Sequence, residues 1–471
     1  MDGMRILITN NTLANRAGSE LYVRDVAKAL LARGHTPIAF STVLGDVADE
    51  LRAATVPVVD SLEDVATPPD IIHGQHHLET MIALLHFPNT PALSFCHGWL
   101  PWEEIPPRFP RIMRYVAVDH TCRDRLVCEN GIPEDRIRVL LNFVDLERFK
   151  TRGPLPARPK RALVFHNSAN DQQPLGIVRE ACNRAGIALD IIGLNAGNVC
   201  TEPEKVLGDY DIVFAKARSA IESMAVGAAV ILFNLTTMGS MVTTSELDRL
   251  RPINFGIRAL QEPLSLEAIE REIARYDAND AARVSERIRS TAGLDSAVEE
   301  ILGLYEASIS EFALMERDSE DELRAASEYL RSLSPRVKED ARLNADRYEL
   351  QNEVNRLRQE RSAMSDNSGD QEISGILLPQ IDDCSRNAQG LLNRFRDKED
   401  EAVALQSQLA AKEQEAVALE LKLSEKELEL ERITNTLGWR LLSRYGPIKY
   451  RFVLPAYRRL QRLLNKTPER Q

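Results

Sequence analysis

The stretch DIVFAKARSAIESMAVGAAVILFN, from Asp211 to Asn234, combines the features of a complete α/β unit. Two short runs of branched apolar residues, 212–214 and 230–233, are typical of buried parallel strands, and residues 220–226 between them have the composition of a helix. Lys216 and Arg218 lie in the loop before the helix, where free backbone amides and the helix dipole favour an anion. The segment therefore predicts a β-loop-α-loop-β unit with an anion-binding site at its mouth.

This segment resembles the nucleotide-sugar site of GT-B glycosyltransferases, particularly those of family 4. In that family a helix of the form EAMAxGxPV carries a glutamate that holds the ribose of the donor nucleotide. The matching residues of this chain are Glu222, Ala225, Gly227 and Val230. The resemblance implies that Glu222 binds the ribose.

Two departures from the family pattern concern the donor sugar and the donor phosphates. Family members usually carry a second glutamate eight positions before the first, where this chain has Phe214. They also place an Arg and a Lys after the first strand of the second domain, whereas residues 164–174, VFHNSANDQQP, contain no cation. That segment offers His166 and Asn167 instead. We expect Lys216 and Arg218 to bind the phosphates, and Gly193 to line the same cleft.

The N-terminal half carries the opening pattern of the same family. Residues 4–10, MRILITN, predict a strand, which is followed by the loop Arg16-Ala17-Gly18, a helix over 19–33 that begins at Ser19 as N-cap, and a second strand over 36–42. The family has a glycine loop, then GxE at a helix start, at this place. The resemblance implies that Gly18 faces the donor and Glu20 the acceptor.

All eight histidines lie within the first 166 residues. His97 follows a predicted strand, and the resemblance implies that it contacts the reacting sugar as a catalytic residue. We place His76 and Trp99 on the acceptor side. A metal site at His73, His76 and His77 is the alternative, but carboxylates at ligand spacing are lacking, although Glu79 is close. We therefore expect neither a metal nor a cofactor, with the nucleotide sugar as substrate.

Composition and linkers give the domain boundaries. A chain of 471 residues with 44% hydrophobic residues can bury two cores and leave over a hundred residues for other structures. The Asn142-x-Val144-Asp145 motif and the proline-rich, cationic segment 152–160 indicate a hinge. The predicted parts are an acceptor-side Rossmann-like domain 1–150, a nucleotide-sugar Rossmann-like domain 151–311, a helical extension 312–361, a linker 362–375, a coiled coil 376–437 and a basic amphipathic tail 438–471.

The coiled coil is predicted from an internal repeat. EAVAL occurs at 401–405 and again at 415–419, fourteen residues or two heptads apart, in an apolar seam that is interrupted by Lys412 and Lys426. We expect an oligomer, and a lone solvated helix is the alternative.

The last segment reverses the acidic charge of the chain. Residues 436–471 contain nine lysines and arginines and one acid among many aromatic and aliphatic residues, a pattern that suits an anionic membrane surface. The segment also resembles the basic GWRL tail of some bacterial surface-polysaccharide enzymes. Nucleic-acid binding and a helix packed on its own coiled coil are the alternatives. No apolar run is long enough to span a bilayer, and six cysteines without CxxC spacing indicate reduced thiols. We expect a cytoplasmic protein that associates peripherally with the inner face of the cell membrane.

Together these patterns predict two doubly wound α/β domains of GT-B type followed by a helical extension. The resemblance implies a glycosyltransferase that transfers a sugar from a nucleotide donor to a glycan or lipid-linked acceptor in surface polysaccharide synthesis, with the retaining stereochemistry usual in family 4. A catalytically inactive scaffold in a polysaccharide-assembly complex and a nucleotide-sugar epimerase are the other hypotheses.

Overall fold

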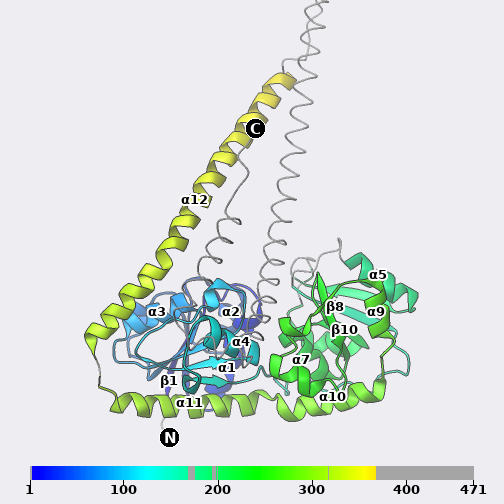
Figure 1. Ribbon diagram of the computed structural model, residues 1–471, viewed down its shortest axis with the longest axis horizontal. Coiled ribbons are helices and arrows are strands. Elements are labelled where there is room, and N and C mark those ends of the chain that lie inside the picture. The colour runs from blue at the N-terminus through cyan, green and yellow to red at the C-terminus, as the bar shows by residue number, and fades with distance from the viewer. Residues whose placement is uncertain (1–2, 168–174, 194–197, 199, 317, 367–471) are drawn as a thin grey trace, which may run out of the picture. The chain divides into compact units, whose positions relative to one another are not determined.

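The computed structural model describes residues 3–167, 175–193, 198, 200–316 and 318–366 (Figure 1). The chain divides into two units, Met1–Asp346 and Arg347–Gln471. Every strand of the described residues lies in the first unit, which contains two α/β domains. The predicted coiled coil 376–437, the tail 438–471 and most of the linker lie outside the described residues.

The first domain is built on a seven-stranded parallel sheet of order β3-β2-β1-β4-β5-β6-β7. The order reverses at β1, which pairs with β2 on one side and β4 on the other, and ligands bind beyond the strand ends at such a switch point. The strands are β1 Arg5–Thr9, β2 Thr36–Phe40, β3 Val58–Val59, β4 Ile71–Gln75, β5 Ala92–Cys96, β6 Ile112–Ala117 and β7 Ile137–Val139. Its helices are α1 Gly18–Ala32, α2 Asp46–Ala53, α3 His77–His86 and α4 His120–Asp124.

The second domain contains a six-stranded sheet of order β13-β12-β11-β10-β8-β9, in which β12 and β13 are antiparallel. Residues 211–234 form the predicted unit, because β10 pairs in parallel with β11 and α7 connects them. Gly227 ends α7 with φ +105°, a left-handed conformation that glycine adopts without a Cβ penalty. The strands are β8 Arg161–Phe165, β9 Ala188–Ile192, β10 Ile212–Ala215, β11 Ala229–Phe233, β12 Thr237–Met241 and β13 Glu262–Pro263. The helices are α5 Leu175–Arg184, α6 Pro203–Val206, α7 Ala217–Val226, α8 Leu247–Leu250, α9 Leu266–Ile273 and α10 Ala278–Thr291.

These two sheets confirm the predicted fold class, two Rossmann-like domains of GT-B type followed by helices. Apolar side chains cover both faces of each sheet, as the branched strand sequences require.

The chain returns to the first domain after α10. Val144 and Gly293 form a parallel bridge where the two crossing segments meet. The next helix, α11 Leu294–Leu314, buries Val298 and Ile301 in the first-domain core, and Tyr305 places its hydroxyl 2.6 Å from His73 Nδ1. Residues 294–311 were predicted to belong to the second domain, and that boundary is wrong because their apolar face packs on the first.

Helix α12, Ser319–Asp366, begins on the first domain. Arg111 is 1% exposed and donates to Glu322 Oε1 at 3.0 Å, while Tyr329 lies 2.7 Å from His77 Nδ1. The helix continues to Asp366, so the predicted start of the linker at Ser362 is wrong. None of the described helices combines the length and apolarity needed to cross a membrane.

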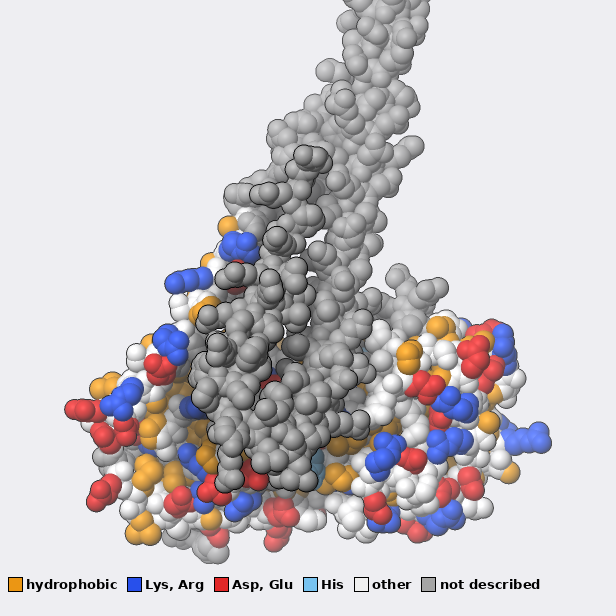
Figure 2. Space-filling model, viewed as in Figure 1, with side chains coloured by type: hydrophobic (Ala, Val, Ile, Leu, Met, Phe, Trp, Pro, Cys, Tyr) orange, Lys and Arg blue, Asp and Glu red, His pale blue; other side chains and the backbone are white. Residues whose placement is uncertain are grey.

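Charged side chains of both signs alternate over the face of the second domain drawn in Figure 2. Many belong to exposed ion pairs such as Arg271 with Glu262, which contribute little to stability.

Candidate functional site

A cavity of about 340 Å³ lies between the loop after β1 and the strand ends of the second domain. From the first domain it is lined by Arg16, Ala17, Gly18 and Leu21. The second domain contributes Phe165, His166, Asn167, Ile192, Gly193, Cys200, Pro203, Lys216, Ala217, Arg218, Ser219 and Glu222. The cavity thus brings together every residue that the sequence assigned to the donor, although those residues span Gly18 to Glu222.

Lys216 is the cation of this cavity whose polar partner is neutral. It precedes α7 in an extended conformation, and its Nζ donates to Asn234 Oδ1 at 3.2 Å. Among the described residues no carboxylate forms an ion pair with it, and burial lowers its pKa. A partly buried ammonium without a counter-charge is expected to be stabilised by an anionic ligand.

His166 borders the same cavity from the end of β8. Its Nε2 lies 3.0 Å from Asn234 Oδ1, and burial, followed by the charge of Lys216, lowers its pKa to about 4. The imidazole is therefore neutral at physiological pH and presents its Nε2 proton to the Asn234 oxygen.

Glu222 is only 5% exposed, on the first turns of α7. Burial raises its pKa, and the neighbouring Arg218 opposes this shift. Arg218 Nε donates to Glu222 Oε1 at 2.8 Å. Among the contacts of the described residues, the other oxygen, Oε2, has no hydrogen-bond partner. One carboxylate oxygen of Glu222 is thus held and the other remains available to a ligand hydroxyl.

Arg218 also reaches the first domain. Its Nη2 donates to Oδ2 of Asp25 on α1, while Arg24 of the same helix binds the other oxygen, Oδ1, at 2.7 Å. Asp25 is 4% exposed. Burial alone would raise the pKa of Asp25, but Arg218 and Arg24 lower it overall, so it is ionised.

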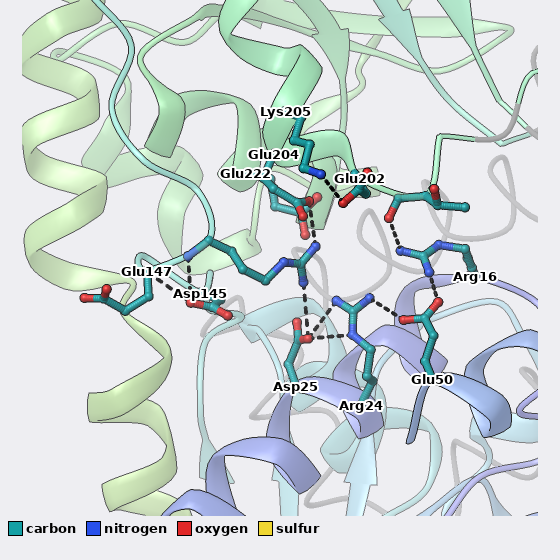
Figure 3. Close-up of polar contacts among 12 residues, drawn as sticks. Arg16, Arg24, Asp25, Glu50, Asp145, Glu147, Glu202, Glu204, Lys205 and Glu222 are labelled. Atoms are coloured by element: carbon teal, nitrogen blue, oxygen red, sulfur yellow. Dashed lines mark hydrogen bonds and ion pairs between the residues drawn. The ribbon is translucent and has the colours of Figure 1, made fainter. Parts of the chain in front are cut away.

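Further polar contacts connect the domains around this pair (Figure 3). Arg148 binds Glu204 at 2.8 Å and lies 3.6 Å from Asp25, and Arg16 Nη2 donates to the carbonyl of Thr201 at 2.7 Å. Glu50 pairs with both Arg16 and Arg24. No local sequence pattern marks Asp25, Arg148, Glu204 or Glu50 as parts of the site.

The predicted catalytic residue His97 does not line the cavity. It follows β5, its backbone N–H donates to Glu104 Oε2 at 2.8 Å, and its ring meets Tyr22 edge-on at 4.6 Å. Burial lowers its pKa to about 4, and its buried Nε2 has no hydrogen-bond partner. The His97 ring is therefore enclosed by protein groups in this structure and is not placed for direct contact with a sugar in the cavity.

On the predicted acceptor side, His76 has a strained backbone with φ +61°, as the residue that precedes α3. Its Nδ1 accepts the N–H of Asn11 at 3.2 Å and its Nε2 lies 3.5 Å from Glu104. Burial lowers the pKa of His76, but Glu104 raises it overall. Glu104, which the sequence analysis missed, thus connects His76 with His97.

Glu20 and Trp99 are the other two residues predicted on the acceptor side, and each has its own set of contacts. Glu20 is 4% exposed near His76, and burial raises its pKa. Ser19 donates its hydroxyl to Glu20 at 2.9 Å, so it does not cap α1, which begins after Ala17. The Trp99 ring is covered by the guanidinium of Arg258 at 5.3 Å. No group of three or more His, Cys, Asp or Glu in the described part of the chain could hold a metal ion.

The first domain matches the family model described as Glycosyltransferase Family 4 over residues 16–148. The resemblance seen in the sequence is thereby confirmed for this domain. A search of curated proteins gave no match.

Among solved structures, a glycosyltransferase from Rickettsia africae is similar at 16% identity, with 66% of this chain and 99% of that chain covered and a TM-score of 0.49. HepE of Anabaena, in complex with UDP and glucose, is similar at 14% identity, with 64% and 100% covered and a TM-score of 0.47. A putative UDP-N-acetylglucosamine 2-epimerase from Listeria monocytogenes is similar at 13% identity, with 68% and 100% covered and a TM-score of 0.44. Such distant likeness does not separate a transferase from an epimerase, since one fold hosts many functions.

Proposed function

We propose that this protein is a glycosyltransferase that moves a sugar from a nucleotide donor to a glycan or lipid-linked acceptor in surface polysaccharide synthesis. The observation that supports this most is the composition of the interdomain cavity, which combines the glycine loop, Lys216 and Glu222. The first domain's family match agrees with it.

In this proposal Lys216 binds the donor diphosphate. An ammonium that is partly buried beside a neutral amide is stabilised by the phosphate charge, and it can stabilise the diphosphate as the diphosphate departs. Asn167 and Gly193 line the same cavity and would border the phosphates or the sugar. Catalysis then consists mainly of positioning and of stabilising the leaving group.

Glu222 would accept a ribose hydroxyl through its unpaired oxygen. Phe214, where the family usually has its other glutamate, is fully buried in the sheet core, so this position supplies no contact to the donor sugar. Retention of anomeric configuration, the usual outcome in family 4, is part of the proposal and is read from the anomer of the product.

An inactive scaffold is the second candidate, because Glu222 is already paired with Arg218 and residues 164–167, at the end of β8 and directly after it, contain no cation. Binding separates the two. We would titrate the full chain with ADP, CDP, GDP and UDP by calorimetry, beside Glu222→Gln and Lys216→Met. Lys160→Met, an exposed lysine of the same domain, is the control.

Selective binding of one nucleotide that both site variants weaken and the control does not would support a donor site. A folded chain that binds none of the four would favour the scaffold. Turnover of the matching nucleotide sugar without an acceptor would favour an epimerase.

The proposal includes an oligomer through residues 376–437 and peripheral binding to the inner face of the cell membrane through residues 438–471. The net charge of +8 between Thr436 and Gln471 supports the second part. Co-sedimentation with vesicles of anionic and of neutral lipid tests it, and equal recovery with both would contradict it.

A further inference from the structure

Arg218 and Glu222 are one helical turn apart on α7; Glu222 is buried, and the Arg218 side chain is 13% exposed. A guanidinium can bind both oxygens of a carboxylate through two parallel N–H donors, and this bidentate geometry is the stronger one. Here only Nε of Arg218 bonds Glu222, and it bonds only Oε1. The pair is therefore held in the weaker, one-point arrangement.

The cause of this arrangement lies in the other domain. Asp25 of α1 accepts a hydrogen bond from Nη2 of Arg218. Without Asp25, this donor could turn toward the second oxygen of Glu222. Arg24 occupies Oδ1 of Asp25, so that Oδ2 is the oxygen directed to Arg218. Oδ2 of the buried Asp25 thus bonds Arg218, whereas Oδ1 binds Arg24 and lies 3.6 Å from Arg148.

Asp25 belongs to the first domain, whereas Arg218 and Glu222 belong to the second. When the domains separate, the guanidinium loses Asp25 and retains Glu222 as its carboxylate partner on the same helix. Bidentate pairing then occupies both oxygens of Glu222. When the domains close, Asp25 draws Nη2 away and frees Oε2.

We propose that Arg218 is a positioning residue that makes ribose recognition by Glu222 depend on closure of the cleft, with Asp25 as the closing contact. The inference rests on the proposed function, in which Glu222 accepts a ribose hydroxyl. It means that an open cleft binds the donor phosphates at Lys216 without discriminating the ribose, and that discrimination begins on closing.

The test is ribose discrimination, measured on the full chain as the ratio of two dissociation constants. The probes are the ribonucleoside diphosphate among ADP, CDP, GDP and UDP that binds most tightly, and its 2′,3′-dideoxy counterpart. A hydrogen bond to a charged group corresponds to about 10- to 100-fold discrimination in the wild type. Glu222→Gln replaces the charged acceptor by a neutral one, and should therefore lower the ratio by roughly 5-fold or more.

Asp25→Asn should reduce the ratio in the same direction as Glu222→Gln, although residue 25 does not touch the nucleotide. Arg218→Met removes the competing guanidinium and should keep discrimination. Because Arg218 also opposes the raised pKa of Glu222, all variants are compared at alkaline pH, where the carboxylate is ionised. In the Asp25→Asn/Arg218→Met double variant the ratio should equal that of Arg218→Met, because Asp25 acts through Arg218. Arg218→Gln serves in the same way if the methionine variant does not fold.

Asp295→Asn is the matched control. Asp295 is an exposed carboxylate that pairs with Arg33, the residue directly after α1; it does not line the cavity, and its loss should leave the ratio unchanged. An unchanged ratio in Asp25→Asn, beside a lowered one in Glu222→Gln, would overturn the coupling and leave the proposed function intact. An equal effect of Asp25→Asn with and without Arg218 would reduce Asp25 to a structural role. Failure of the wild type to bind any of the four nucleotides would overturn both proposals.

Discussion

Lys216 and His166 share one acceptor: Lys216 Nζ lies 3.2 Å and His166 Nε2 3.0 Å from Oδ1 of Asn234. The amide oxygen orients the ammonium without neutralising it. Because the pKa of His166 is lowered to about 4, the imidazole adds no second charge at neutral pH. Lys216 therefore remains a positively charged group in the cavity that can bind an anion.

Lys216→Met should weaken diphosphate binding about 10- to 100-fold, since it removes a charge-assisted hydrogen bond in a partly buried site. Affinity for the corresponding nucleoside, which lacks phosphates, should not change. Calorimetric titration of both ligands measures this, with Lys160→Met as the control. Equal weakening of nucleoside and diphosphate would show that Lys216 supports the fold of the site rather than the phosphates.

Gly193→Ala tests the close approach of two strand ends beside the cavity. A Cβ on Gly193 would clash with the backbone carbonyl of His166, so β8 or β9 must shift. We expect a loss of stability of about 1–3 kcal/mol and weaker nucleotide binding. Gly176→Ala is the control, because its Cβ would meet no neighbour within 4 Å and alanine favours helix α5. Denaturant unfolding of both variants measures the difference, and equal stabilities would contradict the clash.

Arg111 holds the start of α12 on the first domain. Its guanidinium donates to the carbonyls of Leu84, Phe87 and Thr90 as well as to Glu322. Arg111→Met should cost about 3–5 kcal/mol in free energy of unfolding, because it leaves these buried acceptors unpaired. Arg114→Met, which removes a half-exposed ion pair with Glu311, should cost less than about 1 kcal/mol. Similar losses in both variants would show that Arg111 is no special anchor.

His97 should make stability depend on pH. Burial lowers its pKa from 6.5 to about 4. The charge of Glu104 opposes this shift, and the charges of His76 and Arg218 add to it. The unfolded chain therefore binds the proton first as pH falls. This contribution to stability is complete above pH 6.5, is lost between pH 6.5 and 4, and is constant below.

His97→Asn should flatten this dependence by up to about 3 kcal/mol between pH 6.5 and 4, since one pKa unit corresponds to about 1.4 kcal/mol. Urea unfolding at half-unit pH steps gives the slopes, with the exposed His120→Asn as the control. A slope for His97→Asn equal to that of the wild type would contradict the shifted pKa.

The sequence was sufficient to group the residues that line this cavity. Residues such as His166, Gly193 and Lys216 each follow a strand, and the carboxyl ends of parallel strands meet at one edge of a sheet. Local patterns and the order of elements thus determined which side chains share the cavity.

Long-range partners were beyond sequence reasoning. Asp25 and Arg218 are 193 positions apart, and neither has a local pattern that names the other. The signal that existed was the placement of Asp25 next to Val26 in the apolar stripe of α1, where a charge requires a buried partner. For α11, amphipathicity showed that one face is buried but not against which domain.

The bridge between Val144 and Gly293 makes the second domain an insertion in the first. Residues 161–291 supply its sheet and surrounding helices as one continuous stretch, whereas the first domain needs both its own seven strands and α11. During synthesis, the first domain's seven strands leave the ribosome long before Tyr305 can close their core. The second domain can then be complete first, the reverse of the usual N-terminal-first order, and the early strands stay incompletely covered while it forms.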